Sequence, residues 1–139
     1  MNRYKLRENT FKILFLNEFH SDEEMKQQTE MFFEREEFEN IEKADKDTIY
    51  EKYRKITDIT DDLDEQIDKV ASGWKTDRMG RVDLTILRLA VYEMKYDESV
   101  PVSVAINEAV ELAKKYCNEK AAPFINGVLS KIGQDMDEE

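Results

Sequence analysis

Residues 83–96 read DLTILRLAVYEMKY, residues 104–116 read VAINEAVELAKKY and residues 123–132 read PFINGVLSKI. In each of these segments apolar residues recur every three or four positions, which places them on one face of an α-helix. Each segment also holds polar residues that packing alone does not demand: Arg88, Glu93, Asn107, Glu108 and Asn126. The C-terminal part of the chain therefore predicts three helices whose polar residues need an explanation of their own.

The composition favours helices throughout the chain. Of the 139 residues, 38% are charged, whereas only four are glycine and two are proline. A chain of this length buries roughly two-thirds of its unfolded surface and forms one domain. We expect a compact all-α bundle of about six to seven helices, with a single domain over residues 1–134 and an acidic disordered tail at residues 135–139.

The first predicted helix spans about residues 4–19 and has a basic start. Its apolar face holds Leu6, Phe11, Leu14, Phe15 and Phe19, and its basic residues Arg3, Lys5, Arg7 and Lys12 lie off that face. Cations near the positive end of a helix dipole are unfavourable by about 0.3–1 kcal/mol. An external anion would relieve this cost, although a solvated basic start explains the same residues.

Two further helices are predicted in the N-terminal half. Ser21 and Glu24 have the spacing of a capping box, so a peripheral helix begins there and runs to about residue 37. Over residues 49–70 the apolar spacing of three and four predicts one long central helix. Gly73, preceded by Ser72, ends it, because glycine adopts the left-handed conformation past a helix end without strain.

The C-terminal segments predict helices at about residues 82–96, at about residues 102–116 and from about residue 121. Pro101 favours the first turn of the middle helix. Gly127, within the last helix, costs about 1 kcal/mol relative to alanine unless another helix packs against it. We expect such a helix contact at Gly127.

Negative charge is concentrated in the middle of the chain. The net charge is −11, and residues 21–70 carry −10 and residues 135–139 carry −4. Residues 1–20 are net +2 and residues 71–134 are net +1. Because charges are screened within about 8 Å at physiological ionic strength, the acidic segment weakens binding of a polyanion elsewhere without forbidding it.

Few residues have the chemistry of catalysis or metal binding. Cys117 and His20 are the only residues of their types, so neither an internal disulfide nor a zinc or haem cluster is expected. The chain has no phosphate-binding loop, GxSxG or HExxH motif, and its carboxylates lie mostly on solvated faces. We expect no enzymatic activity and no cofactor. Since no apolar run approaches the ~20 residues that span a bilayer, we expect a cytoplasmic protein without membrane association.

A binding function is the other class to consider. Phe124 beside Lys120, at the start of a helix, has the residue types that stack and hold a flipped-out RNA base, although Phe124 also suits a core position. For Arg88, a partly buried pair with Glu93 or with another acid is favoured over a ligand contact.

Several segments taken together carry a resemblance: Trp74 with Arg78, DLTILRLAVYEM, Pro101 with VAINEAVELAKKY, and PFINGVLSKI. They closely resemble the NusB family of transcription antitermination proteins, over the whole chain and most strongly between residues 74 and 132. The resemblance implies an all-helical fold of two packed subdomains without enzymatic activity. It also implies binding of single-stranded boxA RNA from ribosomal operon transcripts as a heterodimer with the ribosomal protein NusE. That complex joins RNA polymerase and other Nus factors and suppresses premature termination.

The resemblance also implies which residues bind. In the family, the basic start of the first helix and the loop into the last helix contribute to the RNA surface, which here corresponds to Arg3, Lys5, Arg7, Lys120 and Phe124. The family's contacts with NusE correspond to Phe15 and Asp83. Phe15 is equally consistent with the core, and Asp83 with an acid that stabilises the dipole of its helix.

Two other functions remain open. The first is an RNA-free helical adaptor or homodimer with the same fold. The second is the NusB-like domain at the front of some RNA methyltransferases, although no catalytic domain follows before residue 139. Because the middle of the chain is acidic, we expect NusE to supply much of the positive surface, so that the heterodimer binds boxA better than this chain alone.

Overall fold

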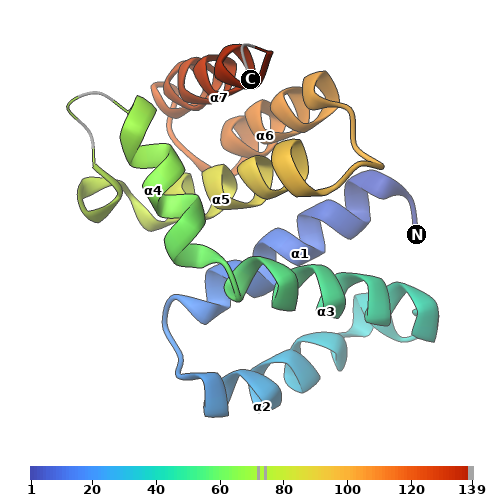
Figure 1. Ribbon diagram of the computed structural model, residues 1–139. Coiled ribbons are helices and arrows are strands. Elements are labelled where there is room, and N and C mark those ends of the chain that lie inside the picture. The colour runs from blue at the N-terminus through green and yellow to red at the C-terminus, as the bar shows by residue number, and fades with distance from the viewer. Residues whose placement is uncertain (72, 74, 138–139) are drawn as a thin grey trace. The chain divides into compact units, whose positions relative to one another are not determined.

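The computed structural model of the chain describes residues 1–71, 73 and 75–137. Seven α-helices and two short 3₁₀ helices form the regular structure of these residues, and no β-strand occurs among them (Figure 1). The predicted all-α fold is therefore confirmed. None of the helices in this part of the chain is both long and apolar enough to cross a bilayer. The helices divide between two compact units, residues 1–58 and residues 59–139.

The first unit contains α1 (Arg3–Asn17), α2 (Asp22–Phe33), the 3₁₀ helix η1 (Glu36–Phe38) and α3 (Lys43–Thr57). α1 packs against both α2 and α3. The buried apolar side chains come from all four elements: Phe11, Ile13, Leu14, Met25, Phe32, Phe38, Ile49, Tyr53 and Ile56. The Tyr53 hydroxyl donates a hydrogen bond to Asn17 Oδ1 at 2.9 Å, so the end of α1 is fixed to α3.

The predicted capping box starts α2. Ser21 Oγ accepts a hydrogen bond from the Glu24 amide at 3.3 Å, and Glu24 Oε1 accepts one from the Ser21 amide at 2.9 Å. The hydrogen bonds from Ser21 lower the pKa of Glu24 because they stabilise its charged form. α2 ends at Phe33 rather than near residue 37, since the following residues turn into η1 and bury Phe38.

The prediction of one long central helix is wrong. α3 ends at Thr57, and α4 (Thr60–Val70) begins after a break in which Ile59 has φ −124° and ψ 24°. The apolar spacing continues across the break. The polar residues at this position, however, favour the end of one helix and the start of another. The Thr57 hydroxyl donates to the Arg54 carbonyl oxygen at 3.1 Å, and Asp61 stabilises the dipole at the start of a new helix. The boundary between the two units falls at the same position.

The second unit contains α4, the 3₁₀ helix η2 (Thr76–Arg78), α5 (Arg81–Tyr96), α6 (Val102–Tyr116) and α7 (Ala121–Asp137). α5 contacts α4, α6 and α7, and α6 also packs along α7 (Figure 1). The core of this unit is aliphatic: Leu63, Ile67, Ile86, Leu87, Ala105, Ala109, Leu112, Ile125 and Leu129. The three predicted C-terminal helices are confirmed, with Pro101 directly before α6.

Glycines mark a turn and a close helix approach in the second unit. Gly73 has φ +80°, the left-handed conformation expected past the end of α4. The expected helix contact at Gly127 is wrong, because a Cβ atom there would meet nothing within 4 Å. The close approach is at Gly133 instead, where a Cβ atom would lie 3.6 Å from Val102 Cγ1 and 3.7 Å from Met94 Cε.

The last helix is longer than predicted. α7 continues to Asp137, so residues 135–137 are helical and not part of a disordered tail. Lys131 Nζ lies 3.3 Å from Asp135 Oδ1, and an ion pair with this spacing stabilises the last turns of a helix. Residues 138–139 of the predicted tail, the predicted helix stop at Ser72 and the motif residue Trp74 lie outside the described residues.

Candidate nucleic-acid interface

The start of α1 is positively charged and exposed. Asn2 caps the helix, because its Oδ1 accepts a hydrogen bond from the Lys5 amide at 2.8 Å. Arg3 and Lys5 are exposed, and the first turn contains no acidic residue. Lys5 Nζ lies 3.3 Å from Oε1 of the buried Glu8, which offsets part of its charge. The helix dipole and the two cations together favour an anion at this end of α1.

Arg7 differs from Arg3 and Lys5, because only 7% of its surface is exposed. It lies four residues before Phe11 and seven before Leu14, so it shares a helical face with these buried side chains. The prediction that Arg7 lies off the apolar face is wrong. A ligand at the start of α1 therefore reaches Arg3 and Lys5 directly, but not Arg7.

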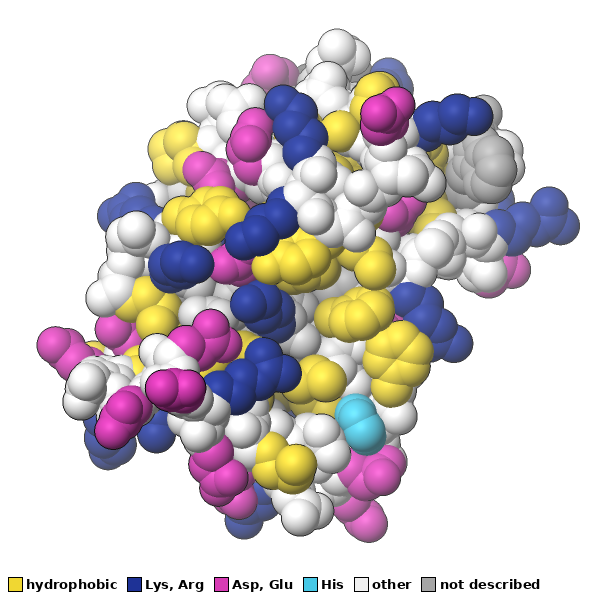
Figure 2. Space-filling model, turned by 180° about the vertical axis from the view of Figure 1, so that it is seen from behind, with side chains coloured by type: hydrophobic (Ala, Val, Ile, Leu, Met, Phe, Trp, Pro, Cys, Tyr) yellow, Lys and Arg dark blue, Asp and Glu magenta, His cyan; other side chains and the backbone are white. Residues whose placement is uncertain are grey.

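Two aromatic side chains near the end of α1 reach the surface. Phe15 is half-buried, with its ring centre 6.4 Å from that of Phe11 and 5.0 Å from that of Phe19. Phe19 was predicted to face the core but is 55% exposed, since α1 ends at Asn17. Figure 2 shows hydrophobic side chains at the surface beside the single histidine, which is His20. Phe15 is thus only partly core, and Phe19 is an exposed aromatic residue that sequence reasoning missed.

A depression of about 320 Å³ in the second unit brings three predicted site residues together. Lys120 comes from the loop before α7, Phe124 from the first turn of α7 and Asp83 from the first turn of α5. The other lining residues are Arg78, Met79, Gly80, Asn118 and Ala121. Because Lys120 and Arg78 are exposed and Phe124 is half-buried, the depression combines two cations with an aromatic ring.

Asn118 holds the loop before α7 in place. Its Oδ1 accepts a hydrogen bond from the Lys120 amide at 3.0 Å, and its carbonyl oxygen accepts one from the Ala121 amide at 3.1 Å. An asparagine that bonds the amide two residues further on forms an Asx turn, which constrains the backbone. The backbone that carries Lys120 toward the depression is therefore constrained before any ligand binds.

Asp83 interacts with the chain's single cysteine. Burial, followed by a hydrogen bond to the Asp83 carboxylate and by its negative charge, raises the pKa of the Cys117 thiol to about 12. The thiol therefore stays protonated at neutral pH and is a poor nucleophile. Cys117 is thus linked to Asp83, which lines the depression.

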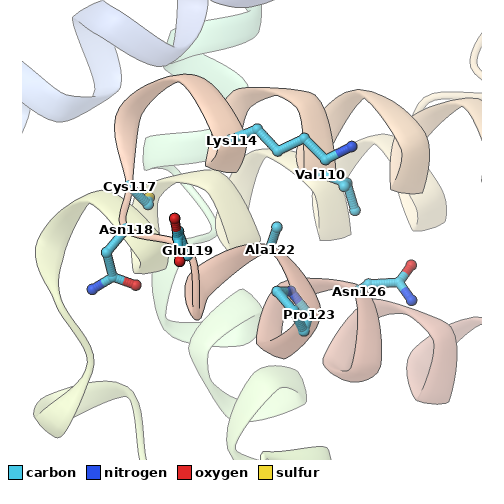
Figure 3. Close-up of a pocket in the computed structure, with 8 residues that line it drawn as sticks. All are labelled: Val110, Lys114, Cys117, Asn118, Glu119, Ala122, Pro123 and Asn126. Atoms are coloured by element: carbon cyan, nitrogen blue, oxygen red, sulfur yellow. The ribbon is translucent and has the colours of Figure 1, made fainter.

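A second depression of about 510 Å³ lies on the other side of the loop, between α6 and α7 (Figure 3). Its lining residues are Val110, Lys114, Cys117, Asn118, Glu119, Ala122, Pro123 and Asn126. Figure 3 shows Val110 and Lys114 on α6 facing Pro123 and Asn126 on α7. The sequence does not predict this groove, because the groove depends on how α6 and α7 pack.

Arg88 has a structural partner. Its Nε and Nη2 atoms each donate a 2.8 Å hydrogen bond to Asp64, to Oδ1 and Oδ2 respectively. The interpretation that Arg88 pairs with an acid is confirmed, and the acid is Asp64 on α4. Arg88 therefore fastens α5 to α4 inside the second unit.

Metal-binding geometry does not occur in the described part of the chain. Over residues 1–71, 73 and 75–137, no group of three or more His, Cys, Asp or Glu side chains is placed to hold a metal ion. The candidate sites consist of cations, aromatic rings and amides, which are suited to binding a polyanion or a protein.

A model of the NusB family matches residues 4–134. The transcription antitermination protein NusB of Agathobacter rectalis is 47% identical over 132 residues, which are 95% of this chain and 99% of that protein. The solved structure of T. maritima NusB has a TM-score of 0.85 at 33% identity, over 96% of this chain and 92% of that one. A crystal structure of the antitermination factors NusB and NusE in complex with dsRNA has a TM-score of 0.77 at 27% identity, over 97% and 99% of the two chains. This chain belongs to the NusB family.

Proposed function

We propose that this chain is a transcription antitermination factor that binds single-stranded boxA RNA of ribosomal operon transcripts together with the ribosomal protein NusE. It suppresses premature termination in the cytoplasm, as part of a complex with RNA polymerase and other Nus factors, and catalyses no reaction. Similarity to a transcription antitermination protein over 95% of the chain supports this function. Similarity to a structure of NusB and NusE with dsRNA supports the two binding partners.

The main structural support for RNA binding is the depression lined by Phe124, Lys120 and Arg78. An aromatic ring stacks on any RNA base and contributes about 1–3 kcal/mol per base, while nearby cations hold the flanking phosphates. Phe124 is half-buried, so packing restrains its ring before a base arrives. The three side chains therefore offer both elements of single-strand recognition.

Further phosphate contacts are proposed in the first unit. Arg3 and Lys5 are exposed in a helix start that lacks acidic residues. A phosphate there gains from both cations and from the helix dipole. Arg7 is buried, and it is proposed to support the conformation of α1 rather than to touch RNA.

NusE is proposed to bind at Phe15 and Asp83. Half-exposed Phe15, beside exposed Phe19, offers an aromatic surface in the first unit. Asp83 adds a negative charge to the depression that contains Lys120 and Phe124. A basic residue of the partner would neutralise this charge and remove its repulsion of RNA phosphates. Since the chain has a net charge of −11, the heterodimer is expected to bind boxA more tightly than the chain alone.

A fluorescence anisotropy titration tests this function. Labelled boxA RNA, a scrambled strand and a double-stranded RNA are each titrated with the chain, with NusE and with the mixture. The proposal expects the mixture to bind boxA most tightly and the scrambled strand weakly. Equal affinity for boxA and scrambled RNA in all three titrations would refute RNA recognition, and equal affinity for the chain and the mixture would refute the role of NusE.

The aromatic pair of half-buried Phe15 and exposed Phe19 favours one alternative, an RNA-free adaptor or homodimer. Salt dependence separates the two functions. Each phosphate contact to a single strand lowers the slope of log affinity against log salt by about 0.7, so RNA binding through Arg3, Lys5 and Lys120 weakens steeply with salt. An adaptor would show no RNA binding at any salt concentration while still binding a protein partner.

A further inference from the structure

The groove between α6 and α7 has the chemistry of a nucleotide site. Val110, Ala122 and Pro123 provide apolar walls, while the amides of Asn118 and Asn126 provide hydrogen-bond donors and acceptors. Figure 3 shows Lys114 extending along α6 above Val110, on the wall opposite Asn126. The space of about 510 Å³ lies within the range of small-molecule sites.

The identity of two residues of α7 is not explained by burial in the second unit. Asn126 is exposed, although it lies within a helix that is otherwise rich in apolar residues. Gly127 is exposed as well, and a Cβ atom there would meet nothing within 4 Å. Glycine destabilises a helix interior relative to alanine, so packing within the described chain does not account for it. A glycine at such a position leaves room for a ligand to approach the backbone closely.

These residues continue one wall of the groove. Pro123, Asn126 and Gly127 are spaced by three and four positions, so they lie on the same face of α7. Gly127 does not line the groove itself, but it lies one turn along α7 from Pro123, which does. The open space at Gly127 is therefore next to the groove.

The groove adjoins the depression already assigned to RNA. Asn118 lines both of them, and Lys120 follows it in the loop that separates them. A strand that stacks one base on Phe124 needs only to pass over this loop to place a neighbouring nucleotide in the groove. Lys114 is 62% exposed, and its ion pair with Glu111 at 3.4 Å is a weak surface pair that a phosphate can replace.

We propose that RNA bound at Phe124 continues over the loop at residues 117–120 into the α6–α7 groove. There a neighbouring base lies against Val110 and Pro123, Asn126 hydrogen-bonds to its edge, and Lys114 contacts a flanking phosphate. This inference rests on the proposed function, because it extends the same RNA surface by one nucleotide site.

The chemistry of the groove favours a base over a protein segment. A side-chain amide pairs donor and acceptor with a base edge, and bidentate pairing of asparagine with adenine is a common form of recognition. Apolar walls accept the faces of a base. Glu119, on the loop side of the groove, repels phosphate, which places the backbone of the strand at the opposite end beside Lys114.

Two variants of α7 test the inference with boxA RNA and NusE. Asn126→Ala removes the proposed hydrogen bond to the base and is expected to weaken RNA binding about fivefold or more. Gly127→Gln fills the open space, so it is expected to weaken RNA binding while keeping or raising the melting temperature, because glutamine favours helix over glycine.

Matched controls lie away from the groove. Gln134→Ala truncates another exposed amide of α7, and Ser103→Gln adds the same side chain as Gly127→Gln at an exposed position of α6. Both controls are expected to bind RNA like the wild type. Phe124→Ala reports on the depression itself, and calorimetry with NusE alone reports on partner binding.

The outcomes separate the inference from the proposed function. If the wild type binds boxA and Phe124→Ala weakens it, but Asn126→Ala and Gly127→Gln bind normally, the groove is not an RNA site while the proposed function stands. If these two variants lose NusE binding in the absence of RNA, the groove holds a protein and the inference is wrong. If the wild type shows no preference for boxA, both the inference and the proposed function are wrong.

Discussion

Arg88 and Asp64 form a bidentate ion pair, with two parallel hydrogen bonds of 2.8 Å from Nε and Nη2 to the two carboxylate oxygens. The side chains are only 16% and 22% exposed, so water screens this pair less than it screens the exposed pairs Lys69–Glu65, Lys114–Glu111 and Lys131–Asp135. The guanidinium fits a carboxylate in this planar geometry better than an ammonium does. Arg88 thus connects α5 to α4, and this accounts for one polar residue of the ILRLA segment without a ligand.

Asp64→Ala is expected to destabilise the protein by about 1–3 kcal/mol, because it removes the bidentate carboxylate from the partly buried guanidinium of Arg88. Chemical denaturation monitored by circular dichroism measures the change. The matched control is Glu65→Ala, which removes an exposed pair with Lys69 at 3.7 Å and is expected to cost under about 0.5 kcal/mol. Equal destabilisation by the two variants would show that the Arg88–Asp64 pair contributes no more to the free energy of unfolding than the exposed pair does.

Arg3→Glu and Arg7→Glu are expected to differ in their effect on folding. Reversing the charge of buried Arg7 costs on the order of 3–5 kcal/mol and lowers the melting temperature markedly. Arg3 is exposed in the first turn of α1, where an acid suits the helix dipole, so Arg3→Glu leaves the melting temperature unchanged while weakening RNA binding. A normal melting temperature for Arg7→Glu would contradict the burial of this side chain.

Local signals predicted much of the fold. The capping box at Ser21, the proline before α6 and the apolar spacing of the last three helices depend on neighbours in the sequence, and all are present in the structure. The break after Thr57 was not predicted, because the apolar spacing passes through it without interruption. The burial of Arg7 was not predicted either, because a charged residue is ordinarily expected to lie off the apolar face of a helix.

The candidate site could be predicted only in part. Lys120 and Phe124 were named from their residue types and from the resemblance, and Asp83 from the resemblance alone. The structure places all three around one depression. The loop conformation set by Asn118 and the proximity of Arg78 depend on how η2, α5 and α7 come together, so spacing along the chain did not reveal them.

Gly127→Ala is expected to stabilise the protein by about 0.5–1 kcal/mol, because the added methyl group meets open space and alanine favours the helix. Gly133→Leu is expected to destabilise it by about 1–3 kcal/mol, since the larger side chain would press on Val102 and Met94. Thermal denaturation of the two variants measures both effects. Destabilisation by Gly127→Ala would mean that another part of the chain packs there after all.

The thiol of Cys117 is expected to resist alkylation until the pH is far above 9, because its pKa is raised to about 12. Asp83→Asn removes the negative charge and one of the two carboxylate oxygens, so this pKa falls and alkylation at pH 9 becomes faster. The folded thiol holds its proton more tightly than an unfolded one, whose ordinary pKa is 9.0, so the stability of the wild type falls as the pH rises from 9.0 toward 12. The rate of alkylation by iodoacetamide is measured for the folded wild type and for folded Asp83→Asn, with the urea-unfolded protein as reference. Identical rates for the two folded proteins would exclude the interaction of Cys117 with Asp83.

Asp83→Lys is expected to change the binding of NusE and of RNA in opposite directions. The reversal removes the proposed acidic contact with the partner, so affinity for NusE measured by calorimetry falls about tenfold or more. It also replaces a repulsive carboxylate with a cation in the depression that contains Lys120 and Phe124, so the chain alone binds RNA as well as the wild type or better. Asp77→Lys, an exposed reversal in η2, controls for net charge and is expected to leave NusE binding intact. Unchanged affinity of Asp83→Lys for NusE would remove Asp83 from the partner surface, because a reversed charge within an interface cannot be neutral there.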